Sequence, residues 1–564
     1  MFQLKYYKKE DFGIMASNKF KMSPFVDSVA IRAKYFPSYI PAVIYGDEKI
    51  NWSDLYSNIK RLANAINDKA QIQKGDKIAF IFHNSPQFLE INFAAQMLGA
   101  VPVPINYRYV ASEFDYTIND CDAVAVLCED SVAEEISKIK GKLPKVKLFA
   151  ADMDAPPPGF EKYEELIHYP KNNVIKVACS DEDVGVIIYT GGTTGRSKGV
   201  MLSNRNLLEN QESILRSLLT ALPETDLNCV KYGATNGEVK YLRAFDLFNS
   251  YFEEYFQENE SDVVTLEFKG SDTMPDLLLS LTSREKKIKI THGAPLENEI
   301  NLKLTVDMKD AFRMILNLLP FVYTKKGRRK AILKVIWLIL RRKIRLKGKL
   351  GKIVAFIKSL LKTSKEKDEE DRMKEFLSLL IVPPMFHLAA YAFFLMFSTY
   401  AGGICVFSDK RSFTPQDIFE KISAHKPKWI FLVPTMYKES IDFMERNPDH
   451  PYDLSSVRIA LSGAALLKAK EKKRILNFLP NTIMIDAFGQ TEMAAISSIK
   501  IDTDPNAVKH GSVGKIGHGI KVKIIKEDGR EARESEVGEI YYRSNTIMKG
   551  YYGDSDKTAR TIDE

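Results

Sequence analysis

The residues best suited to chemistry lie in a loop rich in glycine and threonine at positions 190–198. A β-branched run at 184–189 leads into this loop, and a helix is expected from about Ser203. Glycines let backbone N–H groups turn toward an anion, threonine hydroxyls add donors, and a lysine supplies a positive charge. The set therefore predicts phosphate binding, with a flexible, solvated turn as the structural alternative. The residues concerned are Thr190, Gly191, Gly192, Thr193, Thr194, Gly195 and Lys198.

This loop is not a Walker loop, because that pattern places its lysine directly after a glycine. Here Lys198 stands three positions after Gly195. Any phosphate bound by this loop must therefore be held in a different arrangement from that of a Walker loop.

Three shorter stretches become informative only beside this loop. Residues 486–492 read DAFGQTE and follow a strand-like run at 483–485. Residues 383–387 read PPMFH before an apolar stretch, and residues 462–466 read SGAAL after a strand-like run at 457–461. Taken alone, an aromatic-glycine turn, a lone histidine in an apolar context and a small-residue turn are ordinary structural features.

The complete string at 184–200, VGVIIYTGGTTGRSKGV, resembles the phosphate-binding motif of the adenylate-forming (AMP-binding) superfamily. That superfamily includes acyl-CoA synthetases, firefly-luciferase-like enzymes and the adenylation domains of peptide synthetases. Gly191 stands where serine is usual and Ser197 where proline is usual, and both changes leave the donors and the lysine in place. The resemblance implies that residues 190–198 cradle nucleotide phosphates, with Thr194 and Lys198 taking part in catalysis.

The same resemblance gives roles to the stretch at 486–492, which is similar to the family's Tyr-Gly-x-Thr-Glu motif. It implies that Phe488 stacks on adenine, that Asp486 accepts from the adenine amino group and that Thr491 contacts the AMP phosphate. Gly489 belongs to the same turn, and Glu492 would hold Mg²⁺, a hard cation that suits a carboxylate. Phenylalanine in place of tyrosine keeps the stacking face and loses a hydroxyl.

Two further stretches fit the family pattern. His387 ends an element that resembles Pro-x-Phe-His, which implies a place beside the reacting carboxylate of the acid. Gly463 and Ala464 resemble a small-residue loop on which adenine and the acyl chain lie. The glycines and tyrosines toward the end of the chain, including 549–552, are interpreted as structural parts of the large domain. The family's next elements are a ribose-binding aspartate, a hinge and a small C-terminal domain with a catalytic lysine. The chain ends at Glu564 before them, so an incomplete enzyme is expected.

Alternating strand-like and helix-like segments must position these motifs. A short buried-strand pattern at 77–82 is followed by Ser85-Pro86, a helix-capping pair, and by a stop at Gly99. The rhythm continues through 101–105 and 123–127 and returns around the later motifs, which predicts an α/β fold with largely parallel sheets. With the family resemblance, the expected fold is the large N-terminal domain of adenylate-forming enzymes, in layered α/β subdomains, with an inserted α+β module.

The inserted module is expected at 228–370, between two parts of the large domain at 1–227 and 371–564. It contains strand-like runs in quick succession, at 263–268, 277–281, 287–291 and 301–306, with helices expected at 245–256 and 308–318. Together with a closing strand, glycine turn and helix at 344–361, this order resembles a sterol-carrier-protein type of lipid-binding domain. The stretch at 319–340 departs from that pattern.

The positive charge of the chain is concentrated within this module. Residues 325–367 contain seventeen lysines or arginines and one acidic residue, so the rest of the chain carries about −8 of the total of +8. The apolar run inside this segment is too short to cross a bilayer. Peripheral contact with an anionic membrane or lipid is one interpretation, and a solvated helix face with snorkelling lysines is the other. Nucleic-acid binding is not expected, because no aromatic stacking pattern accompanies the charge.

The predicted function is the ATP-dependent activation of a carboxylic acid, preferably a long-chain fatty acid, to an acyl adenylate and then to acyl-CoA. ATP, Mg²⁺ and the co-substrate CoA are the expected small-molecule partners. The alternatives are an adenylation domain that serves a carrier protein and a catalytically incomplete lipid-binding scaffold. Five cysteines without paired spacing and the lack of an N-terminal apolar run predict a cytoplasmic protein, with peripheral membrane association left open.

Overall fold

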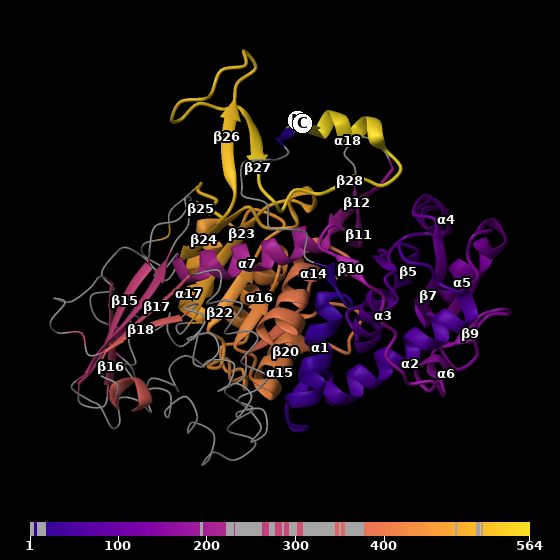
Figure 1. The fold of residues 1–564 in the computed structure, drawn as a ribbon, viewed down its shortest axis with the longest axis horizontal. Coiled ribbons are helices and arrows are strands. Elements are labelled where there is room, and N and C mark those ends of the chain that lie inside the picture. The colour runs from indigo at the N-terminus through magenta and orange to yellow at the C-terminus, as the bar shows by residue number, and fades with distance from the viewer. Residues whose placement is uncertain are drawn as a thin grey trace.

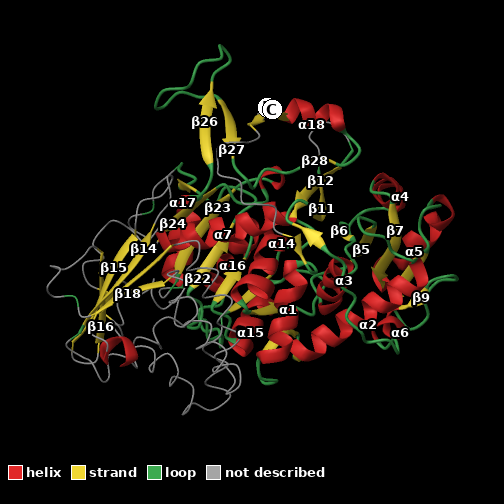
Figure 2. Cartoon of the chain, viewed as in Figure 1, coloured by secondary structure: helices red, strands yellow, loops and turns green. Residues whose placement is uncertain are grey.

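The computed structural model describes residues 5–7, 19–191, 196–220, 230–231, 262–269, 277–284, 287–292, 300, 302–307, 344–348, 351–355, 377–479, 482–502, 508 and 511–563. Within these ranges the strands form six sheets. Two large sheets with helices on their faces make up the body of the molecule (Figures 1 and 2). The α/β architecture predicted from the alternating segments is thereby confirmed.

A five-stranded parallel sheet with the order β6-β5-β7-β8-β9 occupies the N-terminal part of the body. The chain leaves β5 through α3 to β6 on one side and then crosses to β7 on the other. The Ser85 hydroxyl accepts a hydrogen bond from the Phe88 N–H and caps α3, and Gly99 after this helix has a φ of +67°, as the sequence predicted. The strands are β5 (Lys77–Ile81), β6 (Val101–Pro104), β7 (Ala123–Glu129), β8 (Leu148–Asp152) and β9 (Glu161–Lys162).

A nine-stranded sheet with the order β25-β24-β23-β22-β21-β19-β20-β3-β4 forms the second half of the body. Its central strands, from β23 to β3, pair in parallel, so their carboxyl ends meet at one edge of the sheet. The strands are β3 (Pro41–Tyr45), β4 (Glu48–Asn51), β19 (Ser378–Ile381), β20 (Ile404–Phe407), β21 (Trp429–Phe431), β22 (Ile459–Ser462), β23 (Ile483–Phe488), β24 (Ser498–Asp502) and β25 (Lys515–Ile516).

Helices separate and cover the two sheets in layers. One apolar core lies between the sheets and includes α1, α2, α3 and α14; a second packs α4 and α5 on the five-stranded sheet, and a third packs α15, α16 and α17 on the nine-stranded sheet. The helices are α1 (Pro24–Tyr35), α2 (Trp52–Ala70), α3 (Pro86–Met97), α4 (Ala111–Asp120), α5 (Asp130–Ile139), α6 (Tyr163–Ile167), α7 (Asn204–Thr220), α14 (Leu388–Leu395), α15 (Pro415–His425), α16 (Pro434–Arg446), α17 (Ala469–Phe478) and α18 (Ser555–Thr561). Among the helices that the structure describes, none has the length and hydropathy needed to span a bilayer.

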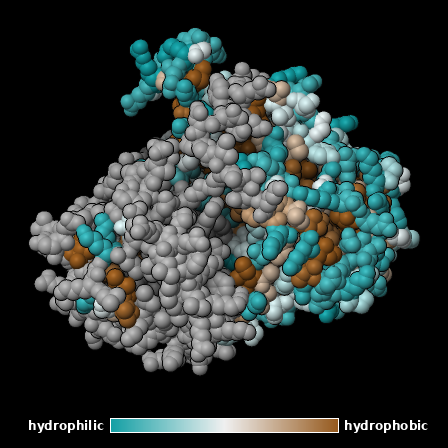
Figure 3. Space-filling view, viewed as in Figure 1, coloured by the Kyte–Doolittle hydropathy of each residue, from teal (hydrophilic) through white to brown (hydrophobic). Residues whose placement is uncertain are grey.

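Three smaller sheets join distant parts of the chain. β10 (Cys179–Ser180) pairs with β2 (Lys19–Phe20), and β11 (Val184–Thr190), β12 (Lys198–Ser203) and β28 (Gly550–Tyr551) form a second sheet. The third brings both ends of the chain together in the order β26-β27-β1-β29, with the strands β1 (Lys5–Tyr7), β26 (Lys521–Ile525), β27 (Glu539–Arg543) and β29 (Ile562–Asp563). The β26–β27 hairpin projects from the body (Figure 1) and has a mainly hydrophilic surface (Figure 3).

The remaining sheet lies in the part of the sequence where an inserted module is expected. Its order is β13-β16-β15-β14-β17-β18, and among the described residues its strands pair only with one another. The strands are β13 (Val230–Lys231), β14 (Val263–Lys269), β15 (Leu277–Arg284), β16 (Lys287–His292), β17 (Leu302–Asp307) and β18 (Ile344–Gly348). The helices expected at 245–256 and 308–318 and most of the basic segment lie outside the described residues.

Candidate active site

The predicted phosphate loop connects the two strands of a β-hairpin. β11 and β12 pair antiparallel with Thr190 opposite Lys198, so the loop proper spans residues 191–197. The sequence interpretation placed Lys198 within the loop and the start of a helix near Ser203, and α7 confirms that start. What the sequence interpretation lacked is the strand β12, which contains Lys198 and runs up to the start of α7 at Asn204. Gly191 is exposed and Lys198 is half-buried, whereas Gly192, Thr193, Thr194 and Gly195 lie outside the described residues.

Helix α4 supports this loop from the five-stranded sheet. The Tyr116 hydroxyl donates a hydrogen bond to the Ser197 carbonyl oxygen at 3.0 Å, and the Arg196 guanidinium lies 5.0 Å from the centre of the Tyr116 ring. The Tyr189 hydroxyl donates to Asp120 Oδ2 at 2.6 Å. The strand before the loop and the residue before β12 are therefore both hydrogen-bonded to α4.

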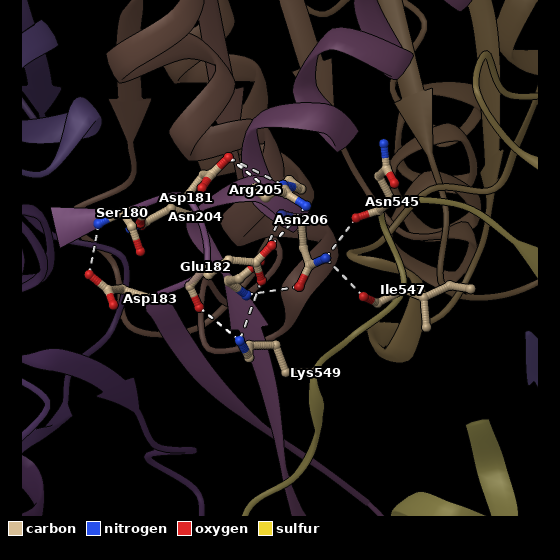
Figure 4. Close-up of polar contacts among 11 residues, drawn as sticks. Ser180, Asp181, Glu182, Asp183, Asn204, Arg205, Asn206, Asn545, Ile547 and Lys549 are labelled. Carbon is tan, nitrogen blue, oxygen red and sulfur yellow. Dashed lines mark hydrogen bonds and ion pairs between the residues drawn. The ribbon is translucent and has the colours of Figure 1, made fainter. Parts of the chain in front are cut away.

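The base of the hairpin is tied to the segment that leads into β28 (Figure 4). The Asn206 side-chain amide donates to the carbonyl oxygens of Asn545 and Ile547 at 2.7 and 2.8 Å. The Lys549 ammonium donates to the Glu182 carbonyl oxygen at 2.9 Å. Because Asn206 is buried, these hydrogen bonds hold the C-terminal segment against the start of α7.

This arrangement brings Lys198 and Glu492 to the same tyrosine, Tyr551. Val200 of β12 pairs with Tyr551 of β28, and the Lys198 ammonium lies 5.8 Å from the centre of the Tyr551 ring. The Tyr551 hydroxyl donates to Glu492 Oε1 at 2.8 Å, and the Met548 N–H donates to the Glu492 carbonyl oxygen at 2.9 Å. The structure thus assembles a cation, an aromatic hydroxyl and a carboxylate beside the predicted phosphate loop.

Glu492 lies in a 3₁₀ turn, Thr491–Met493, directly after the end of β23. Of its two carboxylate oxygens, Oε1 accepts the hydrogen bond from the Tyr551 hydroxyl. A single carboxylate beside a loop suited to phosphate fits Mg²⁺, which takes few protein ligands when nucleotide oxygens supply others. Over the described residues, no group of three or more His, Cys, Asp or Glu side chains could hold a metal ion by itself.

The ends of β22 and β23 form a flat platform next to this turn. Ser462 pairs with Asp486, and a Cβ added at Gly463 would lie 3.2 Å from the Ala487 carbonyl oxygen. Ala464 has a φ of +67° and is exposed. Phe488 is 40% exposed, which is unusual for a phenylalanine at the end of a buried strand. An exposed ring beside small residues can receive a flat ligand such as a base.

Gly489 is required by the packing of the turn after Phe488. A Cβ at this position would overlap the Ala495 carbonyl oxygen, which is a backbone atom that cannot move aside cheaply. The Phe488 carbonyl oxygen accepts from the Ser497 N–H at 2.8 Å, so the turn is held closed. The predicted base-binding residues Gly463, Ala464, Asp486, Phe488 and Gly489 therefore lie together.

His387 lies at the same edge of the nine-stranded sheet but three strands away from β23. It precedes α14, which follows the carboxyl end of β19, and the strand order there is β23-β22-β21-β19. Neighbouring strands are about 4.8 Å apart, so β19, which precedes His387, lies ~10 Å from β22, which precedes Gly463. Part of the His387 side chain is exposed to solvent. The loss of water around the rest of it, followed by the positive charge of Arg108, lowers its pKa. Ligands of open α/β sheets bind along this carboxyl edge.

Aromatic rings line the approach to His387. The Phe386 ring lies 4.4 Å from the His387 ring and 5.3 Å from the Tyr107 ring, which in turn stacks on His83 at 3.7 Å. Asn84 anchors the strand–helix turn, because its side-chain carbonyl accepts from the Met385 N–H at 2.8 Å. The histidine is therefore placed by the junction of the two large sheets.

Two residues near the site had no functional interpretation from the sequence. Tyr551 was interpreted as structural, and the structure adds a hydrogen bond from its hydroxyl to Glu492. Lys472 of α17 was not considered, yet its ammonium forms an ion pair with Asp486. The residues next to Tyr551 and Lys472 in the sequence do not predict these contacts. Each contact depends on a partner that belongs to a different element of the fold.

A profile of the family described as "AMP-binding enzyme" matches residues 30–230 and 351–552. Most of the six-stranded sheet falls in the interval between the two matched parts. The medium-chain-fatty-acid–CoA ligase of Ectopseudomonas oleovorans is 32% identical over 180 residues, 31% of this chain and 32% of that protein. The alignments with the first curated relatives thus span about a third of their length.

A longer but more distant match extends over 530 residues at 21% identity, 92% of this chain and 69% of the relative. That relative is a medium/long-chain-fatty-acid–CoA/3-oxocholest-4-en-26-oate–CoA ligase of Mycobacterium tuberculosis. Among solved structures, a long-chain-fatty-acid–CoA ligase from Archaeoglobus fulgidus superposes with a TM-score of 0.59 at 18% identity, covering 98% of this chain and 80% of that one. The o-succinylbenzoate CoA synthetase of Bacillus subtilis, in complex with an acyl-adenylate intermediate, gives a TM-score of 0.57 at 16% identity, covering 96% and 73%. These likenesses confirm the predicted fold.

Proposed function

The chain belongs to the family of AMP-binding enzymes, and from this membership we propose that it activates a carboxylic acid with ATP in two half-reactions. In the first, a carboxylate oxygen attacks the α-phosphorus of ATP, the bond to the bridging oxygen breaks, and pyrophosphate leaves. In the second, the thiol sulfur of CoA attacks the acyl carbon, AMP leaves with the bonding electron pair, and the thiol proton passes to solvent.

The observation that carries this proposal is the convergence of Lys198 and Glu492 on Tyr551. Three segments that are far apart in the sequence bring the lysine that follows the loop, the carboxylate of Glu492 and the hydroxyl of Tyr551 to one place. A cation and main-chain donors suit the negative charge of phosphates, and they contribute most where that charge grows in the transition state. The exposed Phe488 and the small residues Gly463 and Ala464 supply the adjoining surface for adenine.

Each residue then has a stated task. Residues 190–198 hold the phosphates, Thr491 contacts the α-phosphate, and His387 borders the carboxylate of the acid. Glu492 would hold Mg²⁺ together with phosphate oxygens, and the ion would supply positive charge to the triphosphate. The hydrogen bond from Tyr551 orients the Glu492 carboxylate for this task.

The acid that we propose is a long-chain fatty acid. The chain is similar to ligases named for medium- and long-chain fatty acids, and apolar and aromatic side chains surround the strand–helix turn before His387. We also propose that residues 228–370 form an inserted lipid-binding module of the sterol-carrier-protein type. Its separate six-stranded sheet and the interruption of the family match support that division.

The experiment that tests the function measures pyrophosphate release by the full-length gene product with MgATP and palmitate, compared with a short acid. Lys198→Ala and Glu492→Gln should each reduce this release by roughly 10²–10³-fold, while both variants keep the melting temperature of the wild type. Conversion to palmitoyl-CoA is then followed with CoA present. Release of pyrophosphate without thioester formation would favour an adenylation domain that serves a carrier protein. Calorimetry that detects no heat from ATP or AMP with magnesium would refute the proposal.

A further inference from the structure

Lys472 is a buried cation at an unfavourable place. It lies in the first turn of α17, where the helix dipole is positive, and only 2% of its surface is exposed. Lysine is rarely buried without a partner, because its charge loses the hydration of water. Its position therefore depends on negative charge supplied by its neighbours.

Two carboxylates supply that charge. The Lys472 ammonium forms an ion pair with Asp486 and lies 3.2 Å from Asp502 Oδ2. A second lysine, Lys500, stands opposite Asp486 in the β23–β24 register and lies 3.6 Å from Asp502. Burial opposes the charge of Lys472, but the two carboxylates outweigh it and raise its pKa. The group thus contains two cations and two anions behind the base platform.

The alternation of side chains along β23 shows on which face of the strand Asp486 lies. Met484, Asp486 and Phe488 point to the same face of the strand. Met484 is fully buried in the core that includes α17, and Phe488 is 40% exposed. The Asp486 side chain, 18% exposed, lies between them. Its carboxylate is therefore held at the inner border of the open platform.

We propose that Lys472 is a positioning residue for base selection, because its ion pair holds the Asp486 carboxylate where it accepts from the exocyclic amino group of adenine. This inference rests on the proposed function and assigns a task to a residue outside the motifs. A carboxylate can only accept hydrogen bonds. It therefore favours the 6-amino group of adenine and disfavours the 6-oxo group of hypoxanthine, which would bring two acceptors together.

Removal of the lysine should weaken this selection in a predictable direction. Burial raises the pKa of Asp486, and Lys472 opposes that rise. Without the ammonium the side chain loses its anchor, and its carboxyl group is more readily protonated. A protonated carboxyl can donate to a 6-oxo group, so the preference for adenine should fall.

The test compares AMP with IMP as ligands of the full chain by isothermal titration calorimetry. The wild type is expected to bind AMP about tenfold more tightly than IMP, because IMP leaves the acceptor unpaired. In Lys472→Met the ratio should fall toward one, mainly through weaker AMP binding. Lys472→Arg keeps a cation and should retain part of the preference. Lys470→Met removes an exposed lysine two residues away and should keep the full ratio.

A purely structural lysine would change the melting temperature but not the ratio. If Lys472→Met folds and keeps the ratio of the wild type, the proposal is wrong. If it does not fold, the double variant Lys472→Met/Asp502→Asn removes one charge of each sign, and an unchanged ratio in that variant overturns the proposal equally. A wild type that binds neither nucleotide refutes the proposed function, and this inference with it. If the wild type does bind AMP, the ratios measured for the variants test the role of Lys472 alone.

Discussion

The hydroxyl of Tyr551 donates a hydrogen bond to Glu492 Oε1 at 2.8 Å, across 59 residues of sequence. Burial, followed by the adjacent carboxylate, raises the pKa of Tyr551, so the hydroxyl keeps its proton over the physiological range. The Lys198 and Lys557 ammonium nitrogens both lie near this ring, at 5.8 and 5.7 Å from its centre. Tyr551 is therefore the residue through which the predicted phosphate and magnesium groups are coupled.

Tyr551→Phe should weaken the magnesium-dependent part of ATP binding. The substitution keeps the ring and removes the donor that orients Glu492. A hydrogen bond to a charged group contributes ~1.5–3 kcal/mol, so an effect of about tenfold or more is expected. Calorimetry with ATP, in magnesium and in EDTA, measures it. Tyr552→Phe is the matched control, since its hydroxyl donates to Asp122 at 2.8 Å and not to Glu492. Equal effects of the two substitutions would contradict the assigned role.

Lys198→Ala should reduce fatty-acid-dependent pyrophosphate release by roughly 10²–10³-fold, because a positive charge at the phosphates is lost. Lys557→Ala is the control, because it removes a lysine from the same aromatic ring without touching the loop. That variant should release pyrophosphate at nearly the rate of the wild type. A comparable loss in both variants would show that the ring contact matters, and not the loop position.

Glu90→Gln should flatten the dependence of stability on pH. Glu90 is buried, and burial raises its pKa to about 7 although Tyr163 and Asn58 both donate to it at 2.7 Å. The folded chain then holds a proton that the unfolded chain releases near pH 4.5. The free energy of unfolding should therefore fall as the pH rises from 4.5 through 7, by roughly 3 kcal/mol at most.

Melting temperatures between pH 5 and pH 8 check this sign. Relative to the wild type, Glu90→Gln should be least favourable at pH 5 and gain stability toward pH 8. Glu165→Gln, which changes an exposed carboxylate on the same helix as Tyr163, should follow the wild-type profile. Parallel profiles for all three proteins would exclude Glu90 as the titrating group.

Gly489→Ala should destabilise the chain by about 3 kcal/mol, because the added methyl group would overlap a backbone carbonyl. Gly191→Ala makes the same chemical change in the predicted phosphate loop, where no atom of the residues that the structure describes lies within 4 Å of the added carbon. Thermal unfolding should separate the two variants clearly. If Gly489→Ala melts with the wild type, the turn after Phe488 is wider than the structure has it.

Local elements were predictable because their signals lie within a few residues. The capping of α3 by Ser85, its proline start and the left-handed Gly99 follow from side-chain chemistry that acts over one helical turn. The phosphate loop was predicted for the same reason, since its donors are consecutive in the sequence. The strand β12 was missed because its few apolar residues after the loop resemble the approach to a helix, and its pairing with β11 and β28 supplies the decisive hydrogen bonds.

The sequence by itself determined the fold class, the loop and the residue types suited to a nucleotide. Only the tertiary structure decided that Tyr551 serves Glu492 and that a buried Lys472 stands behind Asp486. Backbone preferences act between neighbours in the chain, whereas an ion pair or a hydrogen bond between separate elements exists only after sheets and helices have packed. Partners of that kind leave no pattern in the residues that surround them.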